Sequence, residues 1–477
     1  LNAKPIGVTG GHNITWDAAY PNAKITEVNG VPADWKPYVY AGTTVTITAN
    51  TEIYSLNGQP IEGSPYNSSY GNNGLDKTTV TFTMPGENVV LSTGELVMKD
   101  GLPDTADMTP QGGRYIGHNW GYDSSTKTLI LMDEKFDFSS THPQGKTPGT
   151  PTTTPVACAI KIEAGAEITG GIFEKEVTNE DGGTISGGTF EGNVTNINGN
   201  ISNGTFNATV TNNDRGKITN GTFNGTVTNN VGTISGGTFQ STGSVTNYSD
   251  IEKGTFNGEV TNHGNIKDGT FEGTVKNWTG TISGGTFKET VINRNGEITG
   301  GTFAGSVTNT YVIYGGVFNG KTGLDRVTGV HSITWDAASP DAKIEKVNGV
   351  SANWAPYVVV TKSTPTTAKE VTITADTEIF SLNGQPIGTD YSSSYVNGNN
   401  KIVTFTMPGE NVVLGTGELV MQGGYPKASN NGTADCKGKG WEYSKIDNTS
   451  NPAGKLTLKK SGKYDFSYTY PQNTSKG

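Results

Sequence analysis

A phenylalanine that returns every 15 to 17 residues between residues 168 and 320 constrains the fold of this chain more than any other feature. An isoleucine stands five residues before each of these phenylalanines, and a valine stands four residues after it in eight of the first nine copies. The repeated phenylalanines are Phe173, Phe190, Phe206, Phe223, Phe239, Phe256, Phe271, Phe287, Phe303 and Phe318. So short and regular a period indicates a repeat architecture rather than one globular core.

Within one repeat, the alternation in "FEGNVTN" is typical of a β-strand. It places Phe190, Val194 and Asn196 on one face and Glu191 and Asn193 on the other. The Gly, Asn, Thr and Val content opposes a helix. We therefore predict an all-β chain that contains a parallel β-solenoid of about ten rungs, formed by a single chain and coiled to the right. Each rung should hold two short strands and glycine-rich corners.

The segments that flank the repeats are copies of each other. "HNITWDAAYPNAKI" from His12 returns as "HSITWDAASPDAKI" from His331, and "VTFTMPGENVVL" occurs twice, at Val80 and Val403. A segment that begins at Trp120 is echoed from Trp441. We predict a β-rich domain at 1–100, a linker and solenoid cap at 101–167, the solenoid at 168–324, a second β-rich domain at 325–424 and the start of another cap at 425–477. This order suggests a piece of a longer protein that alternates the two module types.

An asparagine follows the inward valine of nine repeats by two residues, which should place it inside the coil at a corner. Stacked amides there can hydrogen-bond to one another and to backbone groups that water does not reach. We predict a structural ladder of Asn179, Asn196, Asn212, Asn229, Asn247, Asn262, Asn277, Asn293 and Asn309.

The outward positions of the repeat are left free to meet a partner. The residue before Phe is threonine in eight of ten repeats, and the residue after it is mostly Glu, Asn or Gln. Such a polar surface suits hydroxyl-rich ligands, although a solvated β-surface gives the same pattern. The candidate ligand face consists of Thr189, Glu191, Asn193, Thr205, Asn207, Thr222, Asn224, Thr238, Thr255, Thr270 and Glu272.

We predict no catalytic residue, metal site or cofactor site. Enzymes that cleave polysaccharides need clustered carboxylates, often with calcium or a basic side chain. Acids of the repeats such as Asp181, Asp214, Asp250 and Asp268 lie instead at irregular offsets. The two arginines of the repeats, Arg215 and Arg294, are far apart in rung number, and His263 is their single histidine. A carbohydrate-active enzyme, such as a polysaccharide lyase or hydrolase on a β-helix scaffold, remains the alternative hypothesis.

The two cysteines and the tryptophans of the flanking domains favour structural roles. Cys158 and Cys436 lie far apart and outside any metal-ligand spacing, so we expect one buried and one surface thiol, with a disulfide as the alternative. Tryptophans that could stack on sugars recur at the same place in both copies, which suits a core equally well. They are Trp16, Trp35, Trp335 and Trp354.

The second half of each flanking domain resembles the divergent InlB B-repeat family. The resemblance rests on "VTITA", on "SLNGQPI" and on "FTMPGENVVL", which contains Met84 and Pro85 in the first copy and Met407 and Pro408 in the second. The long opening "HNITWDAAYPNAKI" and an additional loop depart from the family pattern. The resemblance implies stalk-like extracellular modules of bacterial surface proteins, and it brings no catalytic residues.

These patterns together predict a non-catalytic extracellular protein of the bacterial cell surface, or a secreted one, that acts in adhesion or as a stalk. Its expected partners are glycans or the host extracellular matrix, and it is expected to be a monomer. The net charge of −10 argues against nucleic acid. No apolar run is long enough to enter a membrane.

Overall fold

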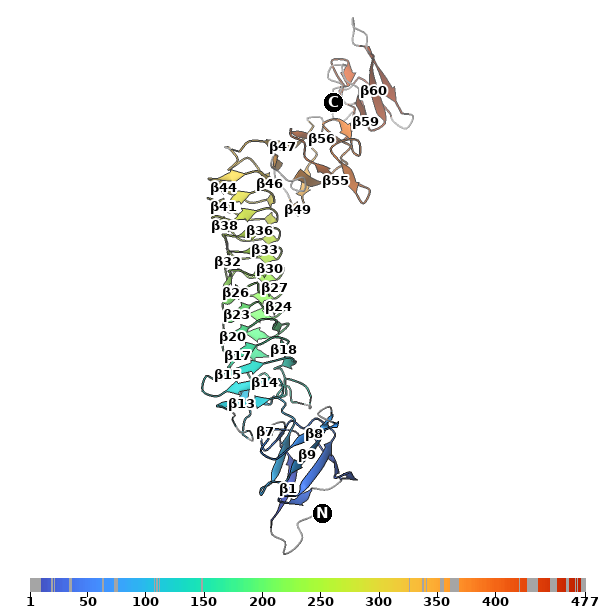
Figure 1. Ribbon diagram of the computed structural model, residues 1–477. Helices are drawn as coiled ribbons and strands as arrows, with labels where there is room; N and C mark the ends of the chain where they lie inside the picture. The colour runs from blue at the N-terminus through green and yellow to red at the C-terminus, as the bar shows by residue number, and fades with distance from the viewer. Residues whose placement is uncertain are drawn as a thin grey trace. The chain divides into compact units, whose positions relative to one another are not determined.

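The computed structural model describes the chain in two compact units, Leu1–Gly243 and Ser244–Gly477. The described residues are 10–18, 20, 22–33, 37–61, 64–72, 76–106, 108, 110, 112–146, 149–325, 327–336, 339, 341–351, 356–360, 369–419, 421–426, 436–446, 453–459, 463–467, 469 and 471–472. They contain no helix, and they form a parallel β-solenoid of about 10 turns over residues 160–318, flanked by small β-rich sheets (Figure 1). The predicted fold class is therefore confirmed.

The first flanking domain consists of two five-stranded sheets that share one core. One sheet has the order β4 (Tyr38–Tyr40), β1 (Gly11–Trp16), β10 (Val89–Ser92), β6 (Ser55–Leu56), β7 (Gln59–Pro60). The other has the order β3 (Val31–Pro32), β2 (Ile25–Val28), β5 (Thr44–Ala49), β9 (Asp76–Thr83), β8 (Ser69–Gly71). In β5 buried residues alternate with more exposed ones, as in a strand with one face on the core. Ile14, Ile47, Phe82 and Leu91 lie at the centre of that core.

Short strands, most of them antiparallel, join this domain to the solenoid. The connecting strands are β11 (Met98–Lys99), β12 (Leu102–Pro103), β13 (Arg114–Gly117), β14 (Trp120–Asp123), β15 (Thr128–Leu131) and β16 (Lys135–Asp137). β15 pairs antiparallel with β14 on one side and parallel with β17 (Ala159–Ile162) on the other. β16 likewise pairs parallel with β18 (Glu167–Gly170). The segment from Trp120 thus connects the antiparallel strands to the first parallel rung of the solenoid.

Each regular rung has three short strands, so the prediction of two per rung was wrong. One rung runs through β21 (Thr184–Ile185), β22 (Thr189–Phe190) and β23 (Val194–Ile197). The isoleucine and the phenylalanine belong to different strands because the glycine pair between them turns the chain: Gly188 has a φ of +104°. Within each unit the inward residues pair in register with their copies one rung on, as Ile185 does with Ile201.

The same three-strand rung recurs in both units. In the first unit the other rung strands are β19 (Ile172–Phe173), β20 (Val177–Asn179), β24 (Asn200–Ile201), β25 (Thr205–Phe206), β26 (Val210–Asn213), β27 (Lys217–Ile218), β28 (Thr222–Phe223), β29 (Val227–Asn229), β30 (Thr233–Ile234) and β31 (Thr238–Phe239). In the second unit they are β32 (Val245–Asn247), β33 (Asp250–Ile251), β34 (Thr255–Phe256), β35 (Val260–Asn262), β36 (Asn265–Ile266), β37 (Thr270–Phe271), β38 (Val275–Asn277), β39 (Thr281–Ile282), β40 (Thr286–Phe287), β41 (Val291–Asn293), β42 (Glu297–Ile298), β43 (Thr302–Phe303), β44 (Val307–Asn309), β45 (Val312–Ile313) and β46 (Gly315–Asn319).

The inward phenylalanines form stacked columns. In the first unit the ring centroids of Phe190 and Phe206 lie 4.8 Å apart, with 7° between the ring planes. In the second unit those of Phe271 and Phe287 lie 4.7 Å apart. These spacings equal the distance between paired β-strands, so the rings follow the backbone ladder.

The inward asparagines form hydrogen-bonded ladders in both units. In the first unit the amide Nδ2 of Asn179 donates to Oδ1 of Asn196 at 2.7 Å, Asn196 donates to Asn212 at 2.7 Å, and Asn212 donates to Asn229 at 2.8 Å. All four side chains are fully buried. In the second unit each side chain donates to the next in the same way, from Asn247 through Asn262, Asn277 and Asn293 to Asn309, which accepts.

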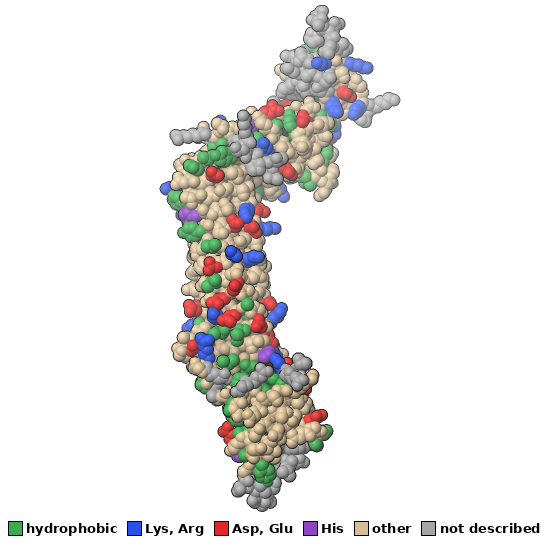
Figure 2. All heavy atoms as spheres, in the orientation of Figure 1, with side chains coloured by type: hydrophobic (Ala, Val, Ile, Leu, Met, Phe, Trp, Pro, Cys, Tyr) green, Lys and Arg blue, Asp and Glu red, His purple; other side chains and the backbone are tan. Residues whose placement is uncertain are grey.

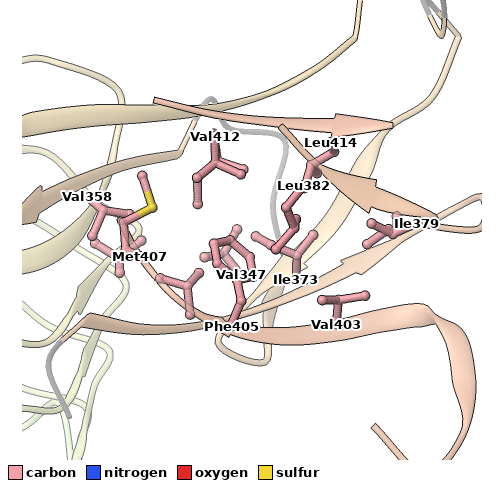
Figure 3. Close-up of a cluster of buried hydrophobic side chains, with 14 residues drawn as sticks. Val347, Val358, Ile373, Ile379, Leu382, Val403, Phe405, Met407, Val412 and Leu414 are labelled. Carbon is pink, nitrogen blue, oxygen red and sulfur yellow. The ribbon is translucent and has the colours of Figure 1, made fainter. Parts of the chain in front are cut away.

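The second flanking domain repeats the topology of the first. One sheet has the order β50 (Pro356–Val360), β47 (Val330–Trp335), β56 (Val412–Gly415), β52 (Ser381–Leu382), β53 (Gln385–Pro386). The other has the order β49 (Val350–Ser351), β48 (Ile344–Val347), β51 (Glu370–Ala375), β55 (Asn399–Thr406), β54 (Ser394–Val396). β46 of the last rung pairs antiparallel with β50. Figure 3 shows the core, where Phe405 and Met407 lie among valines, leucines and isoleucines from both sheets.

A cap follows each flanking domain and contacts it through the same bonds. In the first copy the Trp120 indole donates to the Gly94 carbonyl at 2.8 Å, and Gln144 accepts from the Leu96 amide at 2.7 Å. In the second copy Trp441 donates to Gly417 at 2.9 Å, and Gln472 accepts from Leu419 at 2.7 Å. The strands of the second cap region are β57 (Met421–Gln422), β58 (Tyr425–Pro426), β59 (Cys436–Gly438), β60 (Trp441–Ile446) and β61 (Ala453–Leu458).

Candidate functional site

The threonines predicted to face a ligand form in-register columns on the outside of the rungs. In the first unit Thr189, Thr205, Thr222 and Thr238 pair with one another along β22, β25, β28 and β31. All four are half-buried, and none of their hydroxyl groups hydrogen-bonds to a described residue. Because the backbone amides of these threonines are used in the ladder, the hydroxyl groups are the parts left for a ligand.

The residues that follow the phenylalanines are hydrogen-bonded to one another. Nδ2 of Asn207 donates to Oε1 of Glu191 at 2.8 Å, and Nδ2 of Asn224 donates to Oδ1 of Asn207 at 2.7 Å. Oδ1 of Asn193 accepts from the backbone amide of Thr209 at 3.2 Å. These side chains therefore use part of their hydrogen-bonding capacity on the neighbouring rung, a use that the sequence pattern did not reveal.

In the second unit the candidate ligand face has the same threonine column, and its neighbouring side chains include charged ones. Thr255 and Thr270 pair in register on β34 and β37. The Glu272 carboxylate accepts from the Lys288 ammonium at 2.6 Å, and both side chains remain more than one-third exposed. In Figure 2 the visible surface of the repeats is mostly uncharged and polar, with acidic and basic side chains interspersed. An exposed pair of this kind contributes little to stability.

The acidic residues of the repeats pair with neighbours rather than with one another. The Asp250 carboxylate accepts from the Lys267 ammonium and the Asn265 amide, both at 2.8 Å, and the hydrogen bond from Lys267 lowers the pKa of Asp250. Asp181 accepts from Asn198, and Asp268 accepts from the amide of Gly269. Within the described ranges no three His, Cys, Asp or Glu side chains are grouped as a metal site would require.

The sequence analysis missed a column of planar side chains at one corner of the second unit. The residue after each ladder asparagine is Tyr248, His263, Trp278 and Arg294 in four successive rungs. The rings of Tyr248 and His263 stack with centroids 4.9 Å apart, and the Arg294 guanidinium lies 4.7 Å from the centre of the Trp278 ring. His263 and Arg294, considered as catalytic candidates, thus lie in this stack. The sequence contained little signal for this column, because the residue at the same place in the first unit also varies: it is Glu180, Ile197, Asn213 and Asn230.

The other predicted residues are placed as follows. Trp16 and Trp335 are partly buried against the cores of their domains. Cys158 is buried and unpaired. Trp35, Trp354 and the side chain of Cys436 lie outside the described residues.

Comparison with known proteins finds no matching family model, no matching curated protein and no matching solved structure. The described part of the chain also includes no helix of the length and apolarity that a membrane crossing needs.

Proposed function

We propose that the chain is a non-catalytic part of an extracellular bacterial surface or secreted protein, and that it acts in adhesion by presenting the outward face of the solenoid to glycans or host matrix. The observation that supports this proposal is the column of half-buried threonine hydroxyls, which have no partner among the described residues. The resemblance of the flanking domains to InlB B-repeats is consistent with the same setting.

The column repeats a hydroxyl group at every rung, and the rungs are 4.7 to 4.8 Å apart as measured between stacked phenylalanine rings. A glycan also carries hydroxyl groups at regular intervals along its chain. Each hydrogen bond between the two adds about 1 kcal/mol, so several rungs must act together to give useful affinity. A long series of identical rungs supplies that number.

The test removes hydroxyl groups while keeping the β-branched shape. The variant carries Thr189→Val, Thr205→Val and Thr222→Val. Its matched control carries Thr178→Val, Thr195→Val and Thr211→Val, which lie on successive rungs in the valine-led strands and are half-buried as well. Binding is measured on a glycan array and on immobilised extracellular-matrix proteins.

We expect the first variant to bind at least about tenfold more weakly and the control to bind like the original protein. Equal binding by all three proteins would overturn the assignment of this face. A parallel assay measures the release of soluble products from the polysaccharides that bind. Product release would overturn the non-catalytic proposal in favour of a carbohydrate-active enzyme.

A further inference from the structure

The first flanking domain contains a cavity of about 340 Å³ that the solenoid hypothesis does not use. Its apolar lining includes Ile53 and Ile61, both fully buried, and the rings of Tyr54 and Tyr70. Its polar lining consists of Glu52, Lys77 and His118. A cavity of this size, lined by apolar side chains and a few polar groups in nearly equal parts, has the general form of a site for a small polar molecule.

Backbone bonds fix the residues around the cavity although they are far apart in sequence. The Ile53 amide donates to the Lys77 carbonyl at 2.9 Å, and the His118 amide donates to the Gly94 carbonyl at 2.8 Å. The Tyr54 ring meets the His118 ring edge-on, with centroids 5.9 Å apart. Gly94 lies so close to the Tyr54 ring that an added Cβ would be 2.4 Å from it. The tyrosine is therefore held between a glycine and the imidazole.

Neighbouring residues of the cap fix the tautomer and the charge of His118. The Lys146 ammonium lies 2.6 Å from Nδ1 of His118 and 3.3 Å from the Glu134 carboxylate. Since an ammonium can only donate, Nδ1 accepts and the neutral ring carries its proton on Nε2. Burial, and then the charge of Lys146, lowers the pKa of His118, so the ring is neutral at pH 7. His118 thus adds an N–H donor without adding charge.

The second flanking domain has the same fold but different residues at this place. Phe380 replaces Tyr54, Asn400 replaces Lys77, and Lys439 replaces His118. Lys439 forms an ion pair with Glu378, the counterpart of Glu52. In the first domain the described residues give the Glu52 carboxylate no hydrogen bond or ion pair. Replacing lysine by a neutral histidine therefore leaves Glu52 unpaired next to the two tyrosines.

We propose that this cavity binds one sugar ring of a neutral glycan. The apolar C–H face of the ring packs against the tyrosines, whose rings are apolar with a polar end. The Glu52 carboxylate accepts hydrogen bonds from adjacent hydroxyl groups, and Lys77 and His118 donate. One carboxylate and one ammonium balance each other, which favours an uncharged ligand over an acidic one. This site is separate from the threonine column and does not depend on it.

The test uses the whole chain and two free monosaccharides, N-acetyl-D-glucosamine and D-galactose. Saturation-transfer NMR records which ring protons receive magnetisation from the protein, and a titration gives the dissociation constant. For a ligand of this size we expect a constant of about 1 mM for at least one sugar. Glu52→Gln should weaken binding about tenfold, because it removes a charged acceptor. Glu378→Gln is the matched control and should leave the constant unchanged within about twofold.

Lys77→Asn, which installs the residue of the second domain, provides a second variant and should weaken binding several-fold. The proposal is overturned if neither sugar shows transfer, if Glu52→Gln binds as well as the original protein, or if Glu378→Gln weakens binding equally. The triple threonine variant should keep its monosaccharide binding. If only the triple threonine variant loses binding on the glycan array, the loss reports on the solenoid face. If only Glu52→Gln loses binding to the monosaccharide, the loss reports on this cavity.

Discussion

Replacing one asparagine of the buried ladder by an apolar residue of the same shape tests what holds the rungs together. Asn212 is fully buried and takes part in three hydrogen bonds: it accepts from Asn196, and it donates to Asn229 and to the Gly216 carbonyl. Asn212→Leu keeps the branching at Cγ, although leucine is larger, and it removes all three bonds. Each bond contributes about 1 kcal/mol, so losing the three costs about 3 kcal/mol. The former partners keep other bonds: Asn196 still donates to the Gly199 carbonyl, and the Gly216 carbonyl still accepts from the Thr233 amide. Burying leucine returns roughly 1.5 kcal/mol, but fitting the larger side chain into the packed coil costs about 1–3 kcal/mol, so the net cost is about 3 kcal/mol.

Hydrogen exchange is the suitable assay because long repeat arrays open locally rather than in one step. A loss of about 3 kcal/mol corresponds to roughly 100-fold faster exchange of the amides in β26 and β29. Thr211→Val, the outward neighbour, is the control and should change exchange by no more than about twofold. Equal exchange in the two variants would refute the claim that the amide ladder stabilises the coil.

Three further predictions concern single positions. An alanine Cβ at Gly216 would lie 2.4 Å from Oδ1 of Asn212, so Gly216→Ala should destabilise the solenoid by about 1–3 kcal/mol in chemical denaturation, whereas Gly86→Ala, with open space around it, should not. Burial raises the pKa of Cys158 to about 12, so peptide mapping after iodoacetamide treatment at pH 8 should find this thiol modified only when the protein is unfolded; fast labelling of the native protein would contradict this. Glu272→Gln breaks an exposed ion pair and should change stability by less than about 0.5 kcal/mol; a loss above about 1 kcal/mol would show that the pair is structural.

The inward half of the solenoid could be predicted because it depends on local pattern alone. A parallel rung places each residue over its own copy, so a period of 15 to 17 residues fixes the register without knowledge of the fold. Ile185, Phe190, Val194 and Asn196 are all buried and were all expected to face inward. The position of an asparagine two residues after a buried valine was enough to place it inside the coil.

The number of strands per rung and the role of one glycine were not predictable in the same way. Alternation does not reveal a corner: "FEGNVTN" was taken as one continuous strand, but the chain turns between β22, which ends at Phe190, and β23, which begins at Val194. Gly216 lies against the amides of Asn196 and Asn212, where a side chain has no room. The sequence contains this glycine plainly, but its reason is a contact with two other rungs.

The outward residues were identified correctly as polar, but the sequence did not show how they use their polar groups. Asn207 bonds both Glu191 and Asn224 across rungs, whereas the hydroxyl of Thr205 has no described partner. Side-chain length alone does not decide this, because the Thr219 hydroxyl donates to the Ile201 carbonyl of the neighbouring rung at 3.2 Å. The Thr205 hydroxyl therefore remains available to a ligand because of its position directly before the phenylalanine, where no described group lies within its reach.

The duplicated domains provide an internal comparison that separates structure from recognition. Both copies keep the tryptophan and the glutamine that join domain and cap, Trp120 with Gln144 and Trp441 with Gln472. They differ at His118, where Lys439 in the other copy binds the neighbouring carboxylate. The contact between domain and cap uses the same hydrogen bonds in each copy, so few other residues could replace these tryptophans and glutamines. Among the positions that differ between the copies are side chains that line the cavity, as would be expected if only the first copy binds a sugar.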